Sequence, residues 1–173
     1  MEKKKIQLVA EPLTAEGFAP FGDVIEADPN SENHFSINGG LIERFNDLAT
    51  IDVTPEGGRP LINIAICNKA TALPYHIVFL ERHPLGSQAF IPMDDTPMIV
   101  AVAPAQDHIE PSDIRAFITN GKQGINYNRS VWHMPMAPLA DGIKMLMIDR
   151  GGEGNNYEEF HFPDVDVHLD IPK

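Results

Sequence analysis

The sequence predicts an all-β protein built as an antiparallel sandwich or small barrel. Apolar runs are short throughout the 173 residues, and no stretch shows sustained helical periodicity. Turns rich in proline and glycine separate these runs, and the chain holds 15 prolines, above the usual share of about 5%. Many short strands joined by such turns are typical of closed or double-sheet β architectures. A chain of this length fits a single domain, which we place at residues 1–173.

The expected strands follow from short apolar or alternating runs that end at turn residues. Met98–Ala103 is the clearest, because it is wholly apolar, rich in branched residues and too short for most helices. Thr14 is positioned to cap one short turn of helix, which Pro20 would end. In chain order we expect strands at 6–10, 22–26, 61–67, 75–83, 88–92, 98–103, 114–119, 125–129, 132–133 and 143–149.

Charge and cysteine content exclude several classes of protein. With 25 acidic and 13 basic residues the formal net charge is −12, which opposes binding to nucleic acid or to an anionic membrane. Cys67 is the only cysteine, so neither an intrachain disulfide nor a cysteine-rich zinc site can form, and we expect Cys67 to be buried in a strand. The apolar run at 6–10 is too short for a signal peptide. We therefore expect a cytoplasmic enzyme or binding protein.

Two distant polar segments are the candidates for chemistry. In an extended 79–83 segment, Glu81 and His83 point to the same face of a sheet, and Arg82 points to the other. After a turn, Gln88 begins the next expected strand, so a carboxylate, an imidazole and an amide can converge. The second segment, 126–133, ends in His133. The alternative is that Glu81, Gln88 and His133 form a hydrogen-bonded network that holds a substrate without any ion.

The spacing of these residues is similar to that of cupins, small double-sheet barrels that bind a metal inside. Their first motif is His-x-His followed about four residues later by Glu, and a second motif supplies another His. Here Glu81 replaces the first His and Gln88 replaces the Glu, while His83 and His133 match. The resemblance implies a double-stranded β-helix with a few short helices. It also implies a mixed nitrogen and oxygen ligand set, which suits divalent nickel, manganese, iron or zinc.

The sequence as a whole resembles the ureidoglycolate lyase family over residues from about 8 to 160. The more specific blocks are the Glu-Arg-His-Pro-Leu-Gly run that begins at Glu81 and the Val-Trp-His run that ends at His133. Met134 stands where members of the family often carry a second histidine. The segments that resemble the family, in order, are Phe35–Phe45, Glu81–Pro92, Arg115–Ile118, Gly121–Tyr127, Val131–His133 and Ile148–Gly152.

This resemblance implies a carbon–nitrogen lyase of the amidine-lyase type. Its substrate would be (S)-ureidoglycolate, cleaved to glyoxylate and urea during allantoin degradation in purine metabolism. Two alternatives stay open: an amidohydrolase that releases ammonia from the same substrate, and a non-catalytic cupin that binds a small carboxylate. The resemblance also implies a small-molecule substrate and a homodimer, for which Phe35–Leu48 is the candidate contact.

We predict a role for each candidate residue. Glu81, His83 and His133 are the catalytic candidates, and with Gln88 they are the expected ligands of a divalent metal. Nickel is the first choice, and whether the reaction requires the ion stays open. The substrate-binding candidates are Gln88 itself, two arginines that suit a carboxylate, and two polar residues in blocks that match the family: Arg115, Arg150, Asn126 and Tyr127.

Overall fold

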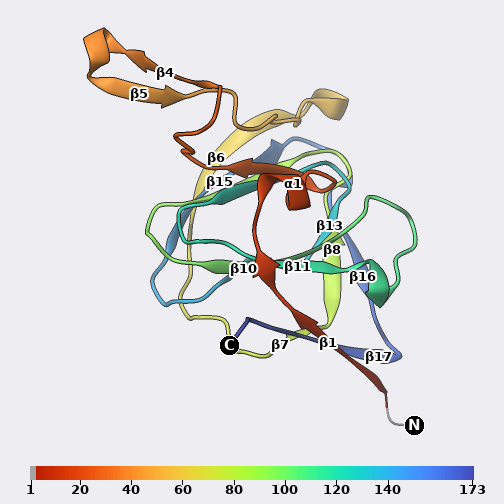
Figure 1. The fold of residues 1–173 in the computed structure, drawn as a ribbon. Helices are drawn as coiled ribbons and strands as arrows, with labels where there is room; N and C mark the ends of the chain where they lie inside the picture. Colours follow the sequence, from red (N-terminus) through yellow and green to blue (C-terminus); the bar gives the residue numbers. More distant parts are fainter. Residues whose placement is uncertain (1–2) are drawn as a thin grey trace.

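Two facing sheets form the body of the molecule (Figure 1). The structure is a computed structural model that describes residues 3–173. Within that range one cluster of buried side chains contains residues from both sheets, including Phe90, Val100, Phe117 and Met145, so the two sheets pack face to face. The five-stranded sheet has the order β3 (Gly22–Ile25), β12 (Gly124–Tyr127), β9 (Gln88–Pro92), β15 (Lys144–Gly151) and β6 (Arg59–Ile66).

The second sheet has seven strands. It pairs antiparallel except at its β2 edge, where β2 runs parallel to β11, and a further strand, β14 (Ala137–Pro138), pairs with β10 beside β13. The order of the others is β16 (Glu158–His161), β8 (Phe79–Arg82), β13 (Trp132–His133), β10 (Met98–Ala103), β11 (Arg115–Ile118) and β2 (Glu11–Pro12).

A third, three-stranded sheet covers the outer face of the seven-stranded sheet, and it consists of β1 (Lys4–Val9), β17 (Val165–Asp170) and β7 (Tyr75–Ile77). A hairpin of β4 (His34–Ile37) and β5 (Ile42–Phe45) projects from the body (Figure 1). The α-helix of the described residues, α1 (Ala15–Phe18), is capped by the Thr14 side chain, which accepts from Gly17 N. Three 3₁₀ turns complete the described elements: η1 (Asn38–Gly40), η2 (Pro55–Gly57) and η3 (Pro111–Asp113).

Strand β10 lies between two apolar cores. All six of its residues are buried, because alternate side chains point to opposite faces of the sheet. Val100 and Val102 pack in the core between the two large sheets. Ile99 and Ala101 pack in the core beneath the three-stranded sheet. This double burial explains why the segment is wholly apolar rather than alternating.

The predicted fold class is confirmed, since antiparallel strands in two facing sheets form the body and helices are few and short. One local expectation differs from the structure. Cys67 follows the end of β6 and is only partly buried, with its thiol donating to Lys69 O. Trp132, the neighbour of His133, packs in the core on the other side of its sheet, where Arg82 lies 4.4 Å from its ring centroid.

Gly22 lies where two backbones approach closely, and this approach yields a prediction. Its φ is +153°, and a Cβ atom there would lie 1.8 Å from the carbonyl oxygen of Asn126. We expect Gly22→Ala to lower the free energy of unfolding by about 3 kcal/mol or more, because backbone atoms must move. Urea denaturation measures this loss. The matched control is Gly39→Ala, where φ is +68° and nothing lies within 4 Å, so a loss of only about 1–2 kcal/mol is expected. Equal losses in both variants would contradict the steric argument.

Candidate active site

Strand register brings Glu81 and His133 together on the inner face of the seven-stranded sheet. His133 pairs with Glu81 on one side and with Val102 on the other. Residues directly opposite each other in a sheet share a face, and Val102 belongs to the core between the two large sheets. Glu81 Oε1 lies 3.5 Å from His133 Nε2. His83 joins them, and one ligand atom from each of the three residues lies within 4.8 Å of the others.

Backbone carbonyls fix the orientation of both imidazoles. His83 Nδ1 lies 2.8 Å from the carbonyl oxygen of Asn156, and His133 Nδ1 lies 3.0 Å from that of Val131. A carbonyl only accepts, so each Nδ1 carries the proton and each neutral ring presents a lone pair at Nε2. Both Nε2 atoms are buried and have no hydrogen-bond partner among the described residues. They are therefore available to a ligand.

Electrostatics keep these groups in the forms that bind cations. Burial acts to raise the pKa of Glu81, but the imidazoles of His133 and His83 and the hydroxyl of Tyr157 outweigh it and hold that pKa below its ordinary value. Burial lowers the pKa of His83, and the neighbouring His133 imidazole acts in the same direction. At neutral pH Glu81 is thus a carboxylate and His83 a neutral imidazole.

The five-stranded sheet supplies the facing wall of the site. Gln88 pairs with Tyr127 across β9 and β12, and the Tyr127 ring stacks on His133 with 4.1 Å between ring centroids. The Oε1 atom of Gln88 is buried without a partner among the described residues. The amide of Gln88 also lies close enough to His83 to affect its pKa. All four predicted metal ligands therefore face one small volume between the sheets.

The donor set fits a divalent metal ion. Two imidazole nitrogens, one carboxylate and one amide oxygen are ligands that first-row divalent ions accept. Three of these groups, on His83, Gln88 and His133, have buried atoms with no partner in the described chain. Hydrogen bonds from Nδ1 to backbone carbonyls also hold the imidazoles as such sites commonly require. The chemistry of the residues present thus supports a metal centre at Glu81, His83 and His133.

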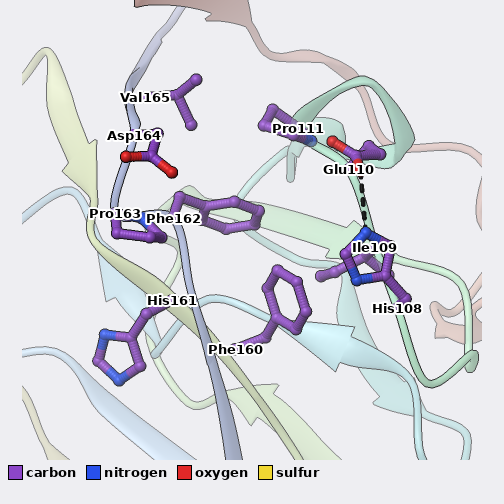
Figure 2. A pocket seen from close by; sticks show the side chains of 10 residues that line it. All are labelled: His108, Ile109, Glu110, Pro111, Phe160, His161, Phe162, Pro163, Asp164 and Val165. Atoms are coloured by element: carbon purple, nitrogen blue, oxygen red, sulfur yellow. Dashed lines mark hydrogen bonds and ion pairs between the residues drawn. The ribbon is translucent and has the colours of Figure 1, made fainter. Parts of the chain in front are cut away.

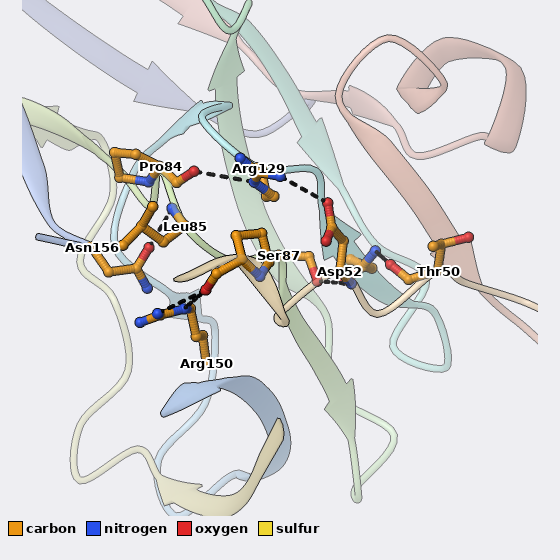
Figure 3. Close-up of polar contacts among 10 residues, drawn as sticks. Thr50, Asp52, Pro84, Leu85, Ser87, Arg129, Arg150 and Asn156 are labelled. Carbon is orange, nitrogen blue, oxygen red and sulfur yellow. Dashed lines mark hydrogen bonds and ion pairs between the residues drawn. The ribbon is translucent and has the colours of Figure 1, made fainter. Parts of the chain in front are cut away.

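The turn after His83 is fixed by contacts from distant segments (Figure 3). Ser87 N donates to Asp52 O at 2.8 Å, and Asp52 N donates to Ser87 Oγ at 2.9 Å. The side-chain oxygen of Asn156 accepts from Leu85 N at 2.7 Å, while its backbone carbonyl holds the His83 ring. Asn156 therefore secures both the ring and the turn that follows it.

Three of the predicted substrate-binding residues do not join this cluster. Arg115 is exposed at the start of β11, where it donates to Gly17 O and pairs with Glu11. Arg150 is buried on the outer face of the five-stranded sheet and donates to Pro55 O (Figure 3).

Asn126 is also on that outer face, because its neighbour Tyr127 points inward. The Asn126 amide donates to Asp23 at 2.9 Å and to Thr50 O at 3.0 Å. These bonds hold the segment around residue 50 against the sheet, which is a structural task. Asn126 therefore stabilises the fold, whereas its neighbour Tyr127 faces the site.

Two residues near the site were missed by sequence reasoning. Tyr157 lies beside the cluster, with its ring centroid 6.2 Å from that of His83, and its hydroxyl donates to Glu159 at 2.5 Å. That hydrogen bond to Glu159 raises the pKa of Tyr157 to about 12, so the phenol keeps its proton. Asp149 points inward from β15, and the signal was available: it shares its face with Met145 and Met147, which belong to the core.

A separate pocket of about 290 Å³ lies elsewhere on the molecule (Figure 2). Phenylalanine and proline side chains form much of its wall, and it contains none of the cluster residues. It is therefore distinct from the candidate active site. Its lining residues are His108, Ile109, Glu110, Pro111, Phe160, His161, Phe162, Pro163, Asp164 and Val165.

Comparison with known proteins shows the family of the chain. The family model described as ureidoglycolate lyase matches residues 5–170. The chain belongs to the ureidoglycolate lyase family. A member from Burkholderia mallei is 50% identical over 157 residues, covering 91% of this chain and 90% of the relative. A member from Chelativorans sp. is 46% identical over 164 residues, covering 94% and 97%.

The chain also resembles solved structures, of which RmlC is an example. RmlC from Streptococcus suis, solved in complex with dTDP-D-xylose, aligns with a TM-score of 0.43 and 11% sequence identity, covering 88% of this chain and 74% of that one. Among the described residues, no helix has the length and apolar character needed to cross a membrane.

Metal binding tests the cluster directly. We expect the purified protein to bind one equivalent of Ni²⁺ in calorimetric titration. His133→Ala and His83→Ala should each weaken binding by about a hundredfold or more, since loss of outer-sphere partners alone costs about 10–100-fold. His108→Ala is the matched control, because His108 is exposed, pairs with Glu110 and lies outside the cluster. Binding that is unchanged in both cluster variants, with the fold verified by circular dichroism, would rule out this site.

Proposed function

We propose that the protein is a ureidoglycolate lyase that cleaves (S)-ureidoglycolate to glyoxylate and urea in allantoin degradation. The observation that carries this proposal is the set of unpartnered buried atoms on His83, Gln88 and His133 beside the Glu81 carboxylate, in the described part of a chain of this family. Relatives with about half of their residues identical bear that enzyme name over nearly their full lengths. We further propose that the enzyme works in the cytoplasm.

The reaction sets three physical demands. In ureidoglycolate one carbon carries a carboxylate, a hydroxyl and a ureido nitrogen. The hydroxyl proton must leave as the carbonyl of glyoxylate forms, the carbon–nitrogen bond must break, and the departing nitrogen must gain a proton to become urea. No water is added. One group that accepts the first proton and returns it to the nitrogen therefore balances the reaction.

We assign the proton transfer to the Glu81 carboxylate, whose second oxygen stays free for the proton when the first holds a metal ion. Its lowered pKa makes it a carboxylate at neutral pH, and it retains some exposure, with 19% of the side chain accessible. His133 is the second candidate for this task because its Nε2 is a free lone pair. Tyr157, which keeps its proton, is placed to hydrogen-bond near Glu81. The stacked Tyr127 ring keeps water from the far face of His133.

The substrate carboxylate needs a positive partner, and the structure brings neither candidate arginine to the cluster. A divalent ion held by Glu81, His83, His133 and Gln88, with nickel as our first choice, would supply that charge and lower the pKa of the substrate hydroxyl. His83 would in that case serve as a ligand only, since its orientation is fixed from outside by Asn156.

Product analysis tests the function. With ureidoglycolate as substrate, the wild type should release glyoxylate and urea in equal amounts, and Glu81→Gln should reduce the rate by about a thousandfold or more, since proton transfer alone contributes about 10²–10⁴-fold. His108→Ala should keep its activity. Ammonia in place of urea would identify an amidohydrolase and overturn the lyase assignment. Ligand-induced thermal stabilisation without turnover would identify a binding protein instead.

We also propose that the protein forms a homodimer through the outer face of β6. Ile62, Ile64 and Ile66 point outward there and are 76%, 54% and 57% exposed. This strand is the edge of its sheet, and an exposed apolar edge strand needs a cover. The outward positions of β6 and of its neighbour β15 carry no carboxylate, although the chain has 25 acidic residues. A second copy can therefore approach without charge repulsion.

The projecting hairpin supplies a second apolar surface, within the contact predicted from the sequence. Phe35 and Ile42 are 46% and 47% exposed, and Leu41 at its tip is 85% exposed. A hairpin that extends from the body is suited to reach a neighbouring subunit.

Light scattering after size-exclusion chromatography tests the dimer. The wild type should have twice the mass of one chain, and Ile64→Asp should have the mass of a single chain, because two buried carboxylates would face the interface. Val78→Asp is the matched control, since Val78 is equally exposed at 54% but lies outside this face. A monomeric wild type, or a dimeric Ile64→Asp variant, would contradict the proposal.

A further inference from the structure

A carboxylate on the inner face of the five-stranded sheet has no part in the mechanism described above. Asp149 pairs with Leu61 across β15 and β6. Its neighbour Ile148 pairs with Ala89, which places Asp149 beside Gln88 in the next strand. Because Gln88 pairs in turn with Tyr127, these four inward residues form one continuous line across the sheet.

That line reaches the proposed active site. Tyr127 stacks on His133, whose ring comes from the opposite sheet. The amide of Gln88 lies close enough to both His83 and Asp149 to affect their pKa values, so it lies between the imidazole and the carboxylate. Asp149 lies outside the group of ligand atoms formed by Glu81, His83 and His133. It is therefore next to the candidate metal ligands without being one of them.

Asn63 holds this carboxylate in place. The Asn63 amide donates to Asp149 Oδ1 at 3.0 Å, which leaves Oδ2 for another donor. Burial raises the pKa of Asp149 above its ordinary value, although the neighbouring His83 imidazole and the amides of Asn63 and Gln88 oppose that shift. A partly buried carboxylate that has one oxygen held by a hydrogen bond is suited to accept a hydrogen bond from a ligand through the other oxygen.

We propose that Asp149 is the residue that recognises the ureido group of the substrate, and that Asn63 is its positioning residue. This inference rests on the proposed function. A ureido group carries two neighbouring N–H donors that point the same way, and a carboxylate accepts such a pair through hydrogen bonds. The hydroxy-acid end of the substrate carries its own negative charge and is repelled by Asp149. Asp149 would therefore place the ureido end of the substrate against the five-stranded sheet and the acid end beside His83 and His133.

Comparison of substrate with product separates recognition from general damage. Glyoxylate shares the acid end of ureidoglycolate but has no N–H group. We expect Asp149→Asn to lower kcat/KM for ureidoglycolate by about tenfold to a hundredfold, the range for loss of a charge-assisted hydrogen bond. The inhibition constant of glyoxylate should change by less than about threefold. Asp107→Asn is the matched control, because the Asp107 side chain is fully exposed.

A second variant keeps the inference testable if Asp149→Asn folds poorly. Asn63→Ala retains the carboxylate and removes its positioning bond, so KM for ureidoglycolate should rise severalfold with an unchanged glyoxylate constant. Equal losses for substrate and product, or no loss in either variant, would overturn the role of Asp149 while leaving the lyase assignment intact. Absence of turnover in the wild type would overturn both.

Discussion

The backbone pairing of His133 with Glu81 and Val102 is the constraint on which the site depends. Strand β13 has only two residues, yet it bridges β8 and β10 and so fixes which side chains face the interior. A shift of one residue in this register would turn His133 toward the outer core and replace it with Trp132 or Met134. Because β10 is packed between two cores, such a shift would also disrupt both. The register of the site is thus secured by the most deeply buried strand of the fold.

The two walls of the site divide the chemistry between them. The seven-stranded sheet supplies Glu81 and His133, whose side chains meet in the space between the sheets. The five-stranded sheet supplies amide and carboxylate groups, with Gln88 and Asp149 in one line. An ionised acid and a ureido group are unlike in charge and in hydrogen bonding, so a substrate that carries both is best held between unlike walls. His83 lies just beyond the end of β8, where Asn156 fixes it from outside the sheet.

Much of this arrangement follows from the sequence, and two of the failures share one cause. Alternation placed Glu81 and His83 on one face and Arg82 on the other, and the structure agrees. In two further places, adjacent residues were available and the sequence did not reveal which one points inward. Tyr127 faces the site while Asn126 faces out, and Arg150 faces out while Asp149 faces in. The sequence of a strand shows that successive side chains alternate between the two faces of the sheet. It does not show which of the two faces is covered, because that depends on the rest of the fold. The positive charge of Arg150 made it the candidate for binding the substrate carboxylate. The buried residues Met145 and Met147 on the same strand indicated instead that Asp149 points inward.

The outward residues have their own function, which explains why they resemble site residues in the sequence. Asn126 and Arg150 bind the carbonyl oxygens of Thr50 and Pro55 and so hold one connecting segment over the outer face of the five-stranded sheet. Ser87 is joined to the same segment through Asp52. This cover ends before β6, where the outer face carries isoleucines instead of polar anchors. The polar side chains Asn126 and Arg150 require hydrogen-bond acceptors, which a segment of the same chain supplies. The exposed isoleucines of β6 can be covered by any other apolar surface. The change from one to the other along the same sheet marks where intramolecular cover stops and where a second subunit would begin.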